Sequence, residues 1–377
     1  MSKLATAEDL AEGGKPSAAV TPEVREELRE LGLRYVSDAV PGITRRRAGK
    51  GFGYRRPDGR PLKDRDTLAW IRSLAIPPAW RDVWISPFRD GHLLAVGRDE
   101  KGRKQYRYHP RWRALRDEAK FGRMLAFGRA LPRIRAAVDE ELARSGLGKR
   151  KVLATVVRLL EGTLIRVGND EYARANKSFG LTTLRDRHFK AEGAKLRFSF
   201  TGKGGKRHVV TLRSRRLATL VKRMQDLPGQ ELFQYVGEGG GPEPIDSADV
   251  NAYLREIAGE DFTAKDFRTW SATVLAAWAL SEFESFDSQA AAKRNVTQAI
   301  ERVAARLGNT PAICRKSYVH PEIVGAYLEG SLLENLKAEI EAELRRELAG
   351  LEPEEVAVLI FLQQRLARGE ADAKVAA

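Results

Sequence analysis

The residues of this chain best suited to chemistry are a tyrosine and several cationic side chains. Tyr318 ends the segment 307–318, in which Arg315 and Lys316 precede it. A phenol becomes a usable nucleophile when nearby cations favour the phenolate. The same cations would neutralise a phosphate, so the pattern indicates attack on a phosphodiester. Further cationic candidates lie upstream: Arg166, Lys203, Lys265 and Arg268.

Each candidate also has a purely structural explanation. Arg166 comes at the end of an apolar helical pattern, where a cation complements the helix dipole. Lys203 lies in the glycine-rich turn 202–206 and could be a solvated turn residue; in the functional hypothesis its ammonium gives a proton to a leaving oxygen. Tyr318 could be a core residue.

The pair Lys265 and Arg268 is harder to explain by structure alone. The two residues lie three apart at the start of a predicted helix, so both should project from one face. A pair of cations near a helix N-terminus opposes the dipole, whereas an anion bound there would gain from the free backbone N–H groups. This spacing therefore favours an anion-binding role.

Bulk composition points to a polyanionic partner. The chain has 377 residues, 42% of them apolar, a net charge of +15 and a pI of about 9.9. The positive charge is concentrated at the front: residues 43–72 contain ten Lys or Arg against three Asp. Nucleic acid is the first candidate partner. No apolar run is long enough to span a membrane and the start lacks a signal peptide, so we expect a cytoplasmic protein.

Metal and disulfide chemistry find little support in the sequence. Cys314 is the only cysteine, which excludes an intramolecular disulfide and a cysteine-rich zinc site. The five histidines are scattered without metal-binding spacing, so we expect no metal and no cofactor. Cys314 lies about one helical turn before Tyr318; a small buried thiol is favoured there over a redox-sensitive one.

Element patterns predict an α+β protein with a small, mainly β N-terminal domain and a larger, mostly helical domain that contains a β-hairpin. We expect a disordered leader at 1–20, the β-rich domain at 21–109, the helical domain at 110–335 and a helical tail at 336–377. Short β-like runs fall at 83–85, 93–96 and 105–108, with one helix near 64–74.

The helical domain should contain a hairpin at its centre. Residues 195–200 alternate strictly, residues 202–206 form the turn, and residues 208–212 return. Thr310 followed by Pro311 predicts the start of a short helix that carries Tyr318. Further helices are predicted at 111–127, 131–145, 151–165, 247–257, 263–280 and 295–307.

Four short strings carry a resemblance to a known family. They are Leu-Ile-Arg-Val-Gly around Arg166, Phe-Thr-Gly-Lys ending at Lys203, Lys-Asp-Phe-Arg-Thr-Trp from Lys265, and Gly-Asn-Thr-Pro around Asn309 followed by Arg-Lys-Ser-Tyr at Tyr318. Together, over about residues 35–333, they resemble the type IB DNA topoisomerases, in particular the poxvirus-like branch found in bacteria. The resemblance implies a catalytic core related to that of the tyrosine recombinases.

The resemblance also implies a reaction. The enzyme would relax supercoiled DNA by cutting one strand through a 3′-phosphotyrosyl bond at Tyr318 and then resealing it, without ATP or metal. Lys203 would protonate the leaving 5′-hydroxyl, with Lys265 as a possible partner. Arg166, Arg268 and Asn309 would hold the non-bridging oxygens. Asn309 stands where the viral members carry a histidine; an amide still donates a hydrogen bond but carries no charge.

In the front domain one strand looks like the groove-contacting strand of the family. It comprises Lys104, Gln105, Tyr106, Arg107 and Tyr108, with Arg98 just before it. Gln105 could read an adenine edge, and the two tyrosines could touch bases or sugars, although ordinary packing explains them equally well. We expect a monomer that closes as a clamp around double-stranded DNA in the nucleoid.

Other classes of protein remain possible on the sequence alone. A tyrosine site-specific recombinase would share the Arg, Lys and Tyr chemistry, but recombinases usually show His-x-Leu-Arg where this chain has Lys265-Asp-Phe-Arg268, and they tend to have a helical front domain. A non-catalytic architectural DNA-binding protein would form no covalent adduct. A metal-dependent nuclease or phosphatase would be sensitive to chelators.

Overall fold

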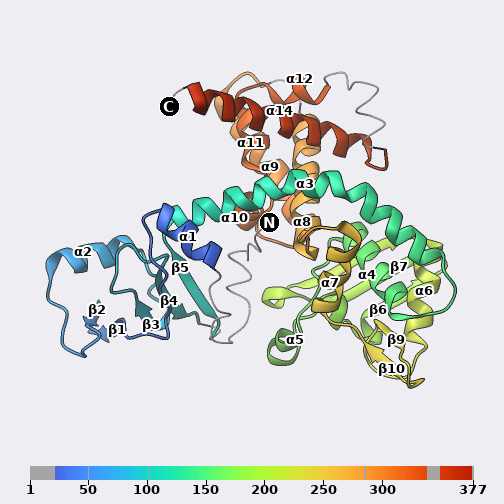
Figure 1. Cartoon of the computed structure of the whole chain (residues 1–377), viewed down its shortest axis with the longest axis horizontal. Helices are drawn as coiled ribbons and strands as arrows, with labels where there is room; N and C mark the ends of the chain where they lie inside the picture. Colours follow the sequence, from blue (N-terminus) through green and yellow to red (C-terminus); the bar gives the residue numbers. More distant parts are fainter. Residues whose placement is uncertain (1–21, 50, 101, 284–285, 338–348, 376–377) are drawn as a thin grey trace. The chain divides into compact units, whose positions relative to one another are not determined.

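The computed structural model describes residues 22–49, 51–100, 102–283, 286–337 and 349–375 (Figure 1). It contains two compact units, the first ending at Phe121 and the second beginning at Gly122. The predicted leader at 1–20 lies outside the described residues, and the predicted tail at 336–377 is described only in part. The expected α+β class is confirmed.

The first unit is built on a five-stranded antiparallel sheet with strand order β2-β1-β3-β4-β5. The apolar cluster beneath it includes Ile43, Ile71 and Ile85, because alternate strand residues turn inward against helix α2. The elements of this unit are α1 (Pro22–Glu30), β1 (Ile43–Ala48), β2 (Gly51–Arg55), α2 (Arg65–Ser73), β3 (Arg81–Ile85), β4 (Leu93–Arg98) and β5 (Lys104–Tyr108).

The sequence prediction missed two of these strands, β1 and β2. Their residues are mostly Arg and Gly and show no alternation of apolar and polar side chains. Arg45 explains how such a strand is held. It donates to the carbonyl oxygens of Pro77 and Trp80 at 3.0 and 2.7 Å, and its guanidinium lies 4.1 Å from the ring centroid of Phe52.

Helix α3 (Pro110–Ala143) corrects a second prediction. The sequence suggested two helices, 111–127 and 131–145, but the structure has one helix of 34 residues with Pro132 inside it. A proline removes one backbone hydrogen bond and favours a kink. Here the helix continues through it, because buried residues on both sides, Phe127, Ile134 and Val138, keep one face packed.

The second unit is mostly helical and confirms the predicted hairpin. Strands β7 (Lys195–Thr201) and β8 (Arg207–Arg213) pair with Phe200 opposite His208, and β6 (Phe189–Glu192) completes a three-stranded sheet. The short strands β9 (Gln234–Val236) and β10 (Pro242–Pro244) form a second small sheet. The helices are α4 (Lys149–Thr163), α5 (Asp170–Asn176), α6 (Arg215–Gln225), α7 (Ser247–Ala258), α8 (Ala264–Ser281), α9 (Gln289–Leu307), α10 (Pro311–Ser317), α11 (Pro321–Leu328), α12 (Leu332–Lys337) and α14 (Pro353–Val375).

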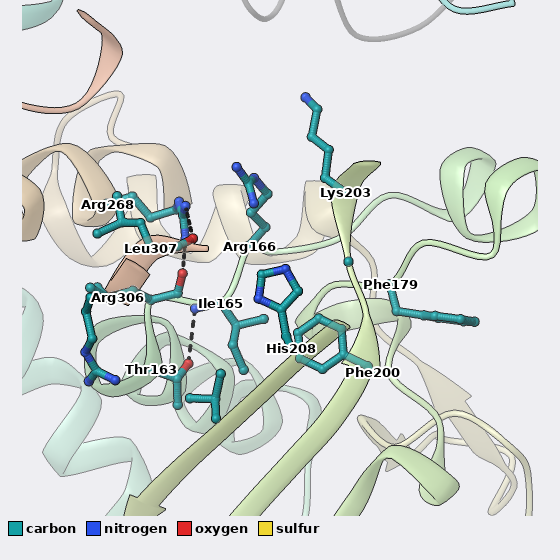
Figure 2. Close-up of a pocket in the computed structure, with 13 residues that line it drawn as sticks. Thr163, Ile165, Arg166, Phe179, Phe200, Lys203, His208, Arg268, Arg306 and Leu307 are labelled. Carbon is teal, nitrogen blue, oxygen red and sulfur yellow. Dashed lines mark hydrogen bonds between the residues drawn. The ribbon is translucent and has the colours of Figure 1, made fainter. Parts of the chain in front are cut away.

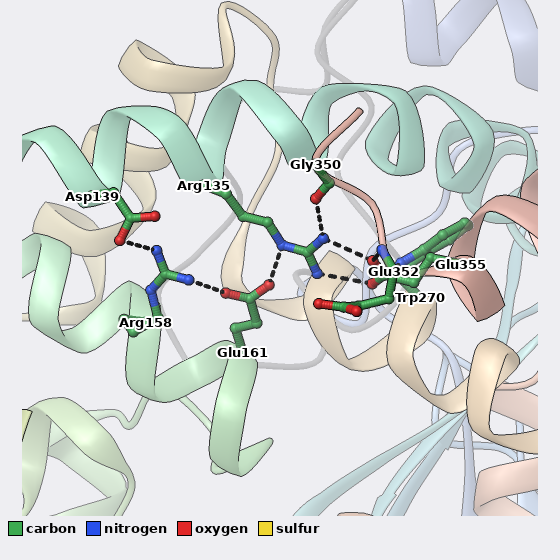
Figure 3. A network of polar contacts seen from close by, with 8 residues as sticks. All are labelled: Arg135, Asp139, Arg158, Glu161, Trp270, Gly350, Glu352 and Glu355. Atoms are coloured by element: carbon green, nitrogen blue, oxygen red, sulfur yellow. Dashed lines mark hydrogen bonds and ion pairs between the residues drawn. The ribbon is translucent and has the colours of Figure 1, made fainter. Parts of the chain in front are cut away.

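A polar network joins four helices of this unit (Figure 3). Arg135 on α3 forms ion pairs with Glu161 of α4 at 2.6 Å and with Glu355 of α14 at 2.8 Å, and it donates to the carbonyl of Gly350 at 2.6 Å. Trp270 of α8 donates its indole N–H to Glu355 at 3.0 Å. The network fixes the C-terminal helix against the helices that carry the candidate site.

Candidate active site

Three of the cationic residues singled out in the sequence surround one pocket in the second unit (Figure 2). Arg166, Lys203 and Arg268 line it together with His208 and Arg306. The side chains of Arg166 and Lys203 extend toward the same side of the pocket. They arrive from the end of α4, the β7–β8 turn and the start of α8, which are far apart in the sequence.

The end of helix α4 positions Arg166. The helix stops at Thr163, and Leu164 caps it in the left-handed conformation with φ 56°. The sequence had placed Arg166 at the C-terminal end of a helix predicted at 151–165; the helix ends earlier, and Arg166 lies in the segment that follows the cap. Its Nη2 donates to Oδ1 of Asn309. In the described part of the chain, the buried Nδ2 of Asn309 has no hydrogen-bond partner, so one donor remains for an anion.

Arg268 is fixed by two backbone carbonyls. The residue is 4% exposed, and its guanidinium donates to the oxygen of Leu164 and, at 2.9 Å, to that of Leu307. The guanidinium carbon also lies 5.3 Å from the ring centroid of Tyr318. A buried cation needs such partners to offset desolvation. These contacts hold the charge at the pocket before any substrate arrives.

The predicted short helix is α10, but Tyr318 is not carried on it: the residue caps the helix directly after its last residue, Ser317. Thr310 caps this helix by accepting from the N–H of Ile313 at 3.3 Å, and Pro311 is its first residue. Tyr318 is 8% exposed; its N–H donates to the carbonyl of Cys314 at 3.0 Å and its own carbonyl accepts from Thr273 at 3.1 Å. The backbone that carries the phenol is therefore held from α10 and α8.

The β7–β8 turn presents Lys203. Gly204 and Gly205 have φ values of 80° and 77°, which L side chains rarely adopt. These glycines allow the tight turn, and the exposed Lys203 stands at its start. Nζ of Lys206, at the other end of the turn, lies 3.4 Å from the carbonyl oxygen of Asn309.

His208 and Arg306 are charged or titratable pocket residues that the sequence reasoning missed. The His208 ring stacks on Phe200 with centroids 5.3 Å apart and an interplanar angle of 10°. Burial lowers the pKa of His208, and the charges of Arg166, Arg268 and Lys206 lower it further. The available signal was strand alternation: His208 pairs with Phe200, on the inward face of the predicted hairpin.

Family models match both units of the chain. The model described as the catalytic core of eukaryotic DNA topoisomerase I matches residues 109–346, and the model of the bacterial DNA topoisomerase IB N-terminal domain matches residues 51–99. DNA topoisomerase 1B of Acanthamoeba polyphaga mimivirus is 32% identical over 287 residues, which cover 74% of this chain and 85% of that protein. The chain belongs to the type IB DNA topoisomerases.

Two further similarities are more distant. DNA topoisomerase 1B of vaccinia virus (strain Copenhagen) is 24% identical over 237 residues, covering 62% of this topoisomerase and 71% of the viral protein. A solved structure of the XerH site-specific recombinase bound to its difH substrate gives a TM-score of 0.34 at 18% identity, covering 51% of this chain and 49% of that chain. A score this low carries no argument about fold or function.

Membership defines the reaction of this enzyme. As a type IB topoisomerase it relaxes supercoiled duplex DNA by cutting one strand through a 3′-phosphotyrosyl intermediate and resealing it. Among the described residues, no group of three or more His, Cys, Asp or Glu could hold a metal ion. No described helix of the topoisomerase is long and apolar enough to cross a membrane.

Lys265 takes a different position from Arg268 in this topoisomerase. It is half-buried in the first turn of α8, and within the described chain only Arg268 of the two lines the pocket. The intervening Asp266 accepts from the backbone N–H of Thr263 at 2.8 Å and lies 3.4 Å from Arg123. This carboxylate at the helix start compensates part of the charge that the cation pair places there.

The six predicted DNA-contacting residues of the topoisomerase lie on β4 and on β5, the last strand of the first unit's sheet. Strand alternation sends Lys104, Tyr106 and Tyr108 to one face and Gln105 and Arg107 to the other. Several are engaged within the unit: Lys104 pairs with Asp38 at 2.6 Å, Gln105 donates to Asp99 at 3.0 Å, Arg107 donates to the carbonyl of Ala75 at 2.7 Å, and Arg98 donates to that of Gly102 at 2.9 Å.

Tyr108 has a packing role within the first unit. Its ring lies 6.3 Å from that of His92 and 5.9 Å from that of Tyr106. Burial raises the pKa of Tyr108 above its usual range.

Proposed function

We propose that Tyr318 is the nucleophile and that the scissile phosphate lies between Arg166, Arg268 and Asn309. One arrangement supports this assignment above all. Arg268 lines the pocket and lies 5.3 Å from the Tyr318 ring, while Arg166 reaches the same pocket and bonds to Asn309. A phosphodiester placed there would face two guanidinium groups and an amide donor.

The two arginines and the amide would act on charge that builds up on the non-bridging oxygens. Arg268 needs no rearrangement, since two carbonyls already fix it. Donors fixed in this way are worth more in a partly desolvated site than in water. Losing one such donor typically lowers the rate by about 10²–10³-fold.

Lys203 would be the general acid of the cleavage step. The bond between Tyr318 Oη and phosphorus forms, the bond from phosphorus to O5′ breaks, and the Lys203 ammonium gives its proton to O5′, while the phenol proton leaves to water. Lys265 is a possible partner in this transfer. Religation reverses each change, so the phosphodiester energy is retained and no ATP is needed. Lys and Arg supply the positive charge that a metal would otherwise provide.

We further propose that the enzyme acts as a monomer and that each unit contributes a DNA-contacting surface, the first through β4 and β5. Arg98, Lys104 and Arg107 would contact phosphates, which position the duplex, whereas Gln105 and Tyr106 would reach base edges or sugars. With a net charge of +15, the enzyme would bind nucleoid DNA in the cytoplasm.

Plasmid relaxation in EDTA without ATP tests the assignment of Tyr318. Tyr318→Phe should abolish both relaxation and the covalent DNA adduct trapped by SDS. Tyr253→Phe is the matched control, because the Tyr253 hydroxyl is buried without a hydrogen-bond partner in the described chain, so its loss leaves nothing unpaired. Relaxation by Tyr318→Phe at the parental rate would show that the nucleophile is elsewhere.

A further inference from the structure

The imidazole of His208 lies against two segments of the candidate site, the β7–β8 turn at Gly202 and the corner between α9 and α10 at Gly308. Figure 2 shows the ring beside Phe200 and Arg166. A Cβ added at Gly202 would lie 2.6 Å from Cδ2 of His208, and one added at Gly308 would lie 2.1 Å from its Cε1. Contacts this short mean that the ring touches the backbone at both glycines. Gly202 directly precedes Lys203, and Gly308 directly precedes Asn309.

The ring itself is firmly placed. Phe200 covers one of its faces by stacking, and the register of β7 with β8 puts the two residues directly opposite each other. Cross-strand aromatic pairs of this kind stabilise a hairpin near its turn. His208 therefore belongs to the rigid part of the hairpin, whereas Lys203 belongs to the turn with its two left-handed glycines.

A neutral His208 ring can pack between segments that carry several cations. Burial and the neighbouring Arg166, Arg268 and Lys206 lower its pKa, so the ring is neutral at pH 7. A neutral ring adds no repulsion where cations must gather around a phosphate. It can therefore pack closely against Gly308 without competing with the arginines for the substrate.

We propose that His208 is a positioning residue that holds the Lys203 turn against the α9–α10 corner, residues 308–310. The proposal rests on the proposed roles of Lys203 and Asn309. Phe200 fixes one face of the ring. The edge of the ring sets the distance between the turn that carries Lys203, the proposed proton donor, and the segment that carries the amide of Asn309. The contact of Lys206 with the Asn309 carbonyl at 3.4 Å is a second link between the same segments.

A sulfur leaving group separates this role from a general structural one. When sulfur replaces O5′ at the cleaved bond, the leaving thiolate needs no proton. A thiol has a pKa of about 8.5, whereas a hydroxyl leaving group is a far weaker acid, close to water with its pKa of about 15.7. A residue that acts by positioning Lys203 becomes dispensable on that substrate. A residue that supports the whole site stays necessary on both.

The experiment is single-turnover cleavage of a duplex that carries a cleavage site mapped on plasmid DNA, with oxygen or sulfur at the 5′ position. On the oxygen substrate His208→Ala should slow cleavage by about 10–100-fold, since a misplacement of about 1 Å costs up to 10²-fold. On the sulfur substrate it should cleave within a few-fold of the parent. The double variant with Lys203→Ala should be no slower on oxygen than Lys203→Ala alone.

Two matched variants complete the design. Asn309→Ala removes a donor to the non-bridging oxygens, which are the same in both substrates. Its cleavage should therefore stay slow with oxygen and with sulfur. Gly202→Ala pushes a methyl group against His208 from the turn side, at a backbone φ of −99° that alanine adopts freely. It should reproduce the His208→Ala pattern, and it replaces that variant if His208→Ala does not fold.

The outcomes separate the proposed role of His208 from the proposed role of Lys203. Two results would overturn the positioning role of His208: slow cleavage by His208→Ala on both substrates, or cleavage at the parental rate on the oxygen substrate. In either case sulfur would still restore cleavage by Lys203→Ala. If sulfur fails to restore Lys203→Ala, the proton-donor role of Lys203 is wrong, and the inference about His208 is lost with it.

Discussion

Replacing Arg135 with methionine should destabilise the second unit far more than replacing an exposed arginine. The Arg135 side chain is 17% exposed, and its partners Glu161 and Glu355 are 20% and 12% exposed. Methionine keeps the length of the stem but leaves the partly buried Glu355 without a cation among the described residues, while Glu161 keeps only its pair with Arg158 at 3.4 Å. Breaking a buried ion pair from one side typically costs about 3–5 kcal/mol.

The control is Arg302→Met on α9 of the same unit. Arg302 pairs with Glu282 at 2.5 Å, but the two side chains are 56% and 57% exposed. Exposed pairs are worth about 0–1 kcal/mol, because water screens them. The free energy of unfolding should therefore separate the two variants by at least about 2 kcal/mol when both are measured by denaturant titration.

A compensating variant tests the cause of the loss. Adding Glu355→Gln to Arg135→Met removes the uncompensated charge and should recover much of the stability, since glutamine can still accept from the Trp270 indole. Equal losses in Arg135→Met and Arg302→Met would refute the reasoning. So would a double variant that is no more stable than Arg135→Met, because the penalty would then not come from buried charge.

Two further predictions concern the site and the first unit. Asn309→Asp keeps an oxygen for Arg166 but replaces the Nδ2 donor, which has no partner among the described residues, with a charged acceptor. Single-turnover cleavage should therefore slow by at least about 10²-fold; a loss below tenfold would contradict a donor role. Burial holds the pKa of His92 at about 4 against its ordinary value of 6.5. As the pH falls, the unfolded state thus takes up the proton before the folded state does. His92 should therefore contribute about 3 kcal/mol to the free energy of unfolding above pH 6.5, and this contribution should be lost as the pH falls to 4. His92→Gln, which can still accept from the N–H of Val36, should flatten this dependence of the unfolding free energy on pH; an unchanged slope would show that other groups cause it.

Features encoded by local chemistry were predictable from the sequence. The hairpin follows from strict alternation around a glycine-rich turn, and the start of α10 follows from Thr310 and Pro311. The catalytic candidates were found as residue types in local strings, and the structure brings Arg166, Lys203 and Arg268 to one pocket. Their catalytic roles remain predictions.

Features that depend on distant parts of the chain were not predictable. Strands β1 and β2 are held by contacts such as those of Arg45 with carbonyls more than thirty residues away. The end of α4 at Thr163 depends on the left-handed Leu164, which the sequence does not mark with a glycine. His208 gains its position only when the hairpin meets the α9–α10 corner.

The two carbonyls that hold Arg268 have a consequence for how the enzyme is synthesised. They belong to residues 104 and 39 positions away, and Tyr318 lies later still in the chain. A nascent chain that ends before Leu307 already carries most of the cations that attract DNA, but it lacks the second carbonyl and Tyr318, the proposed nucleophile. Under the proposed mechanism such a chain binds the chromosome without cutting it. Under that mechanism, the order of translation would keep unfinished enzyme from making strand breaks.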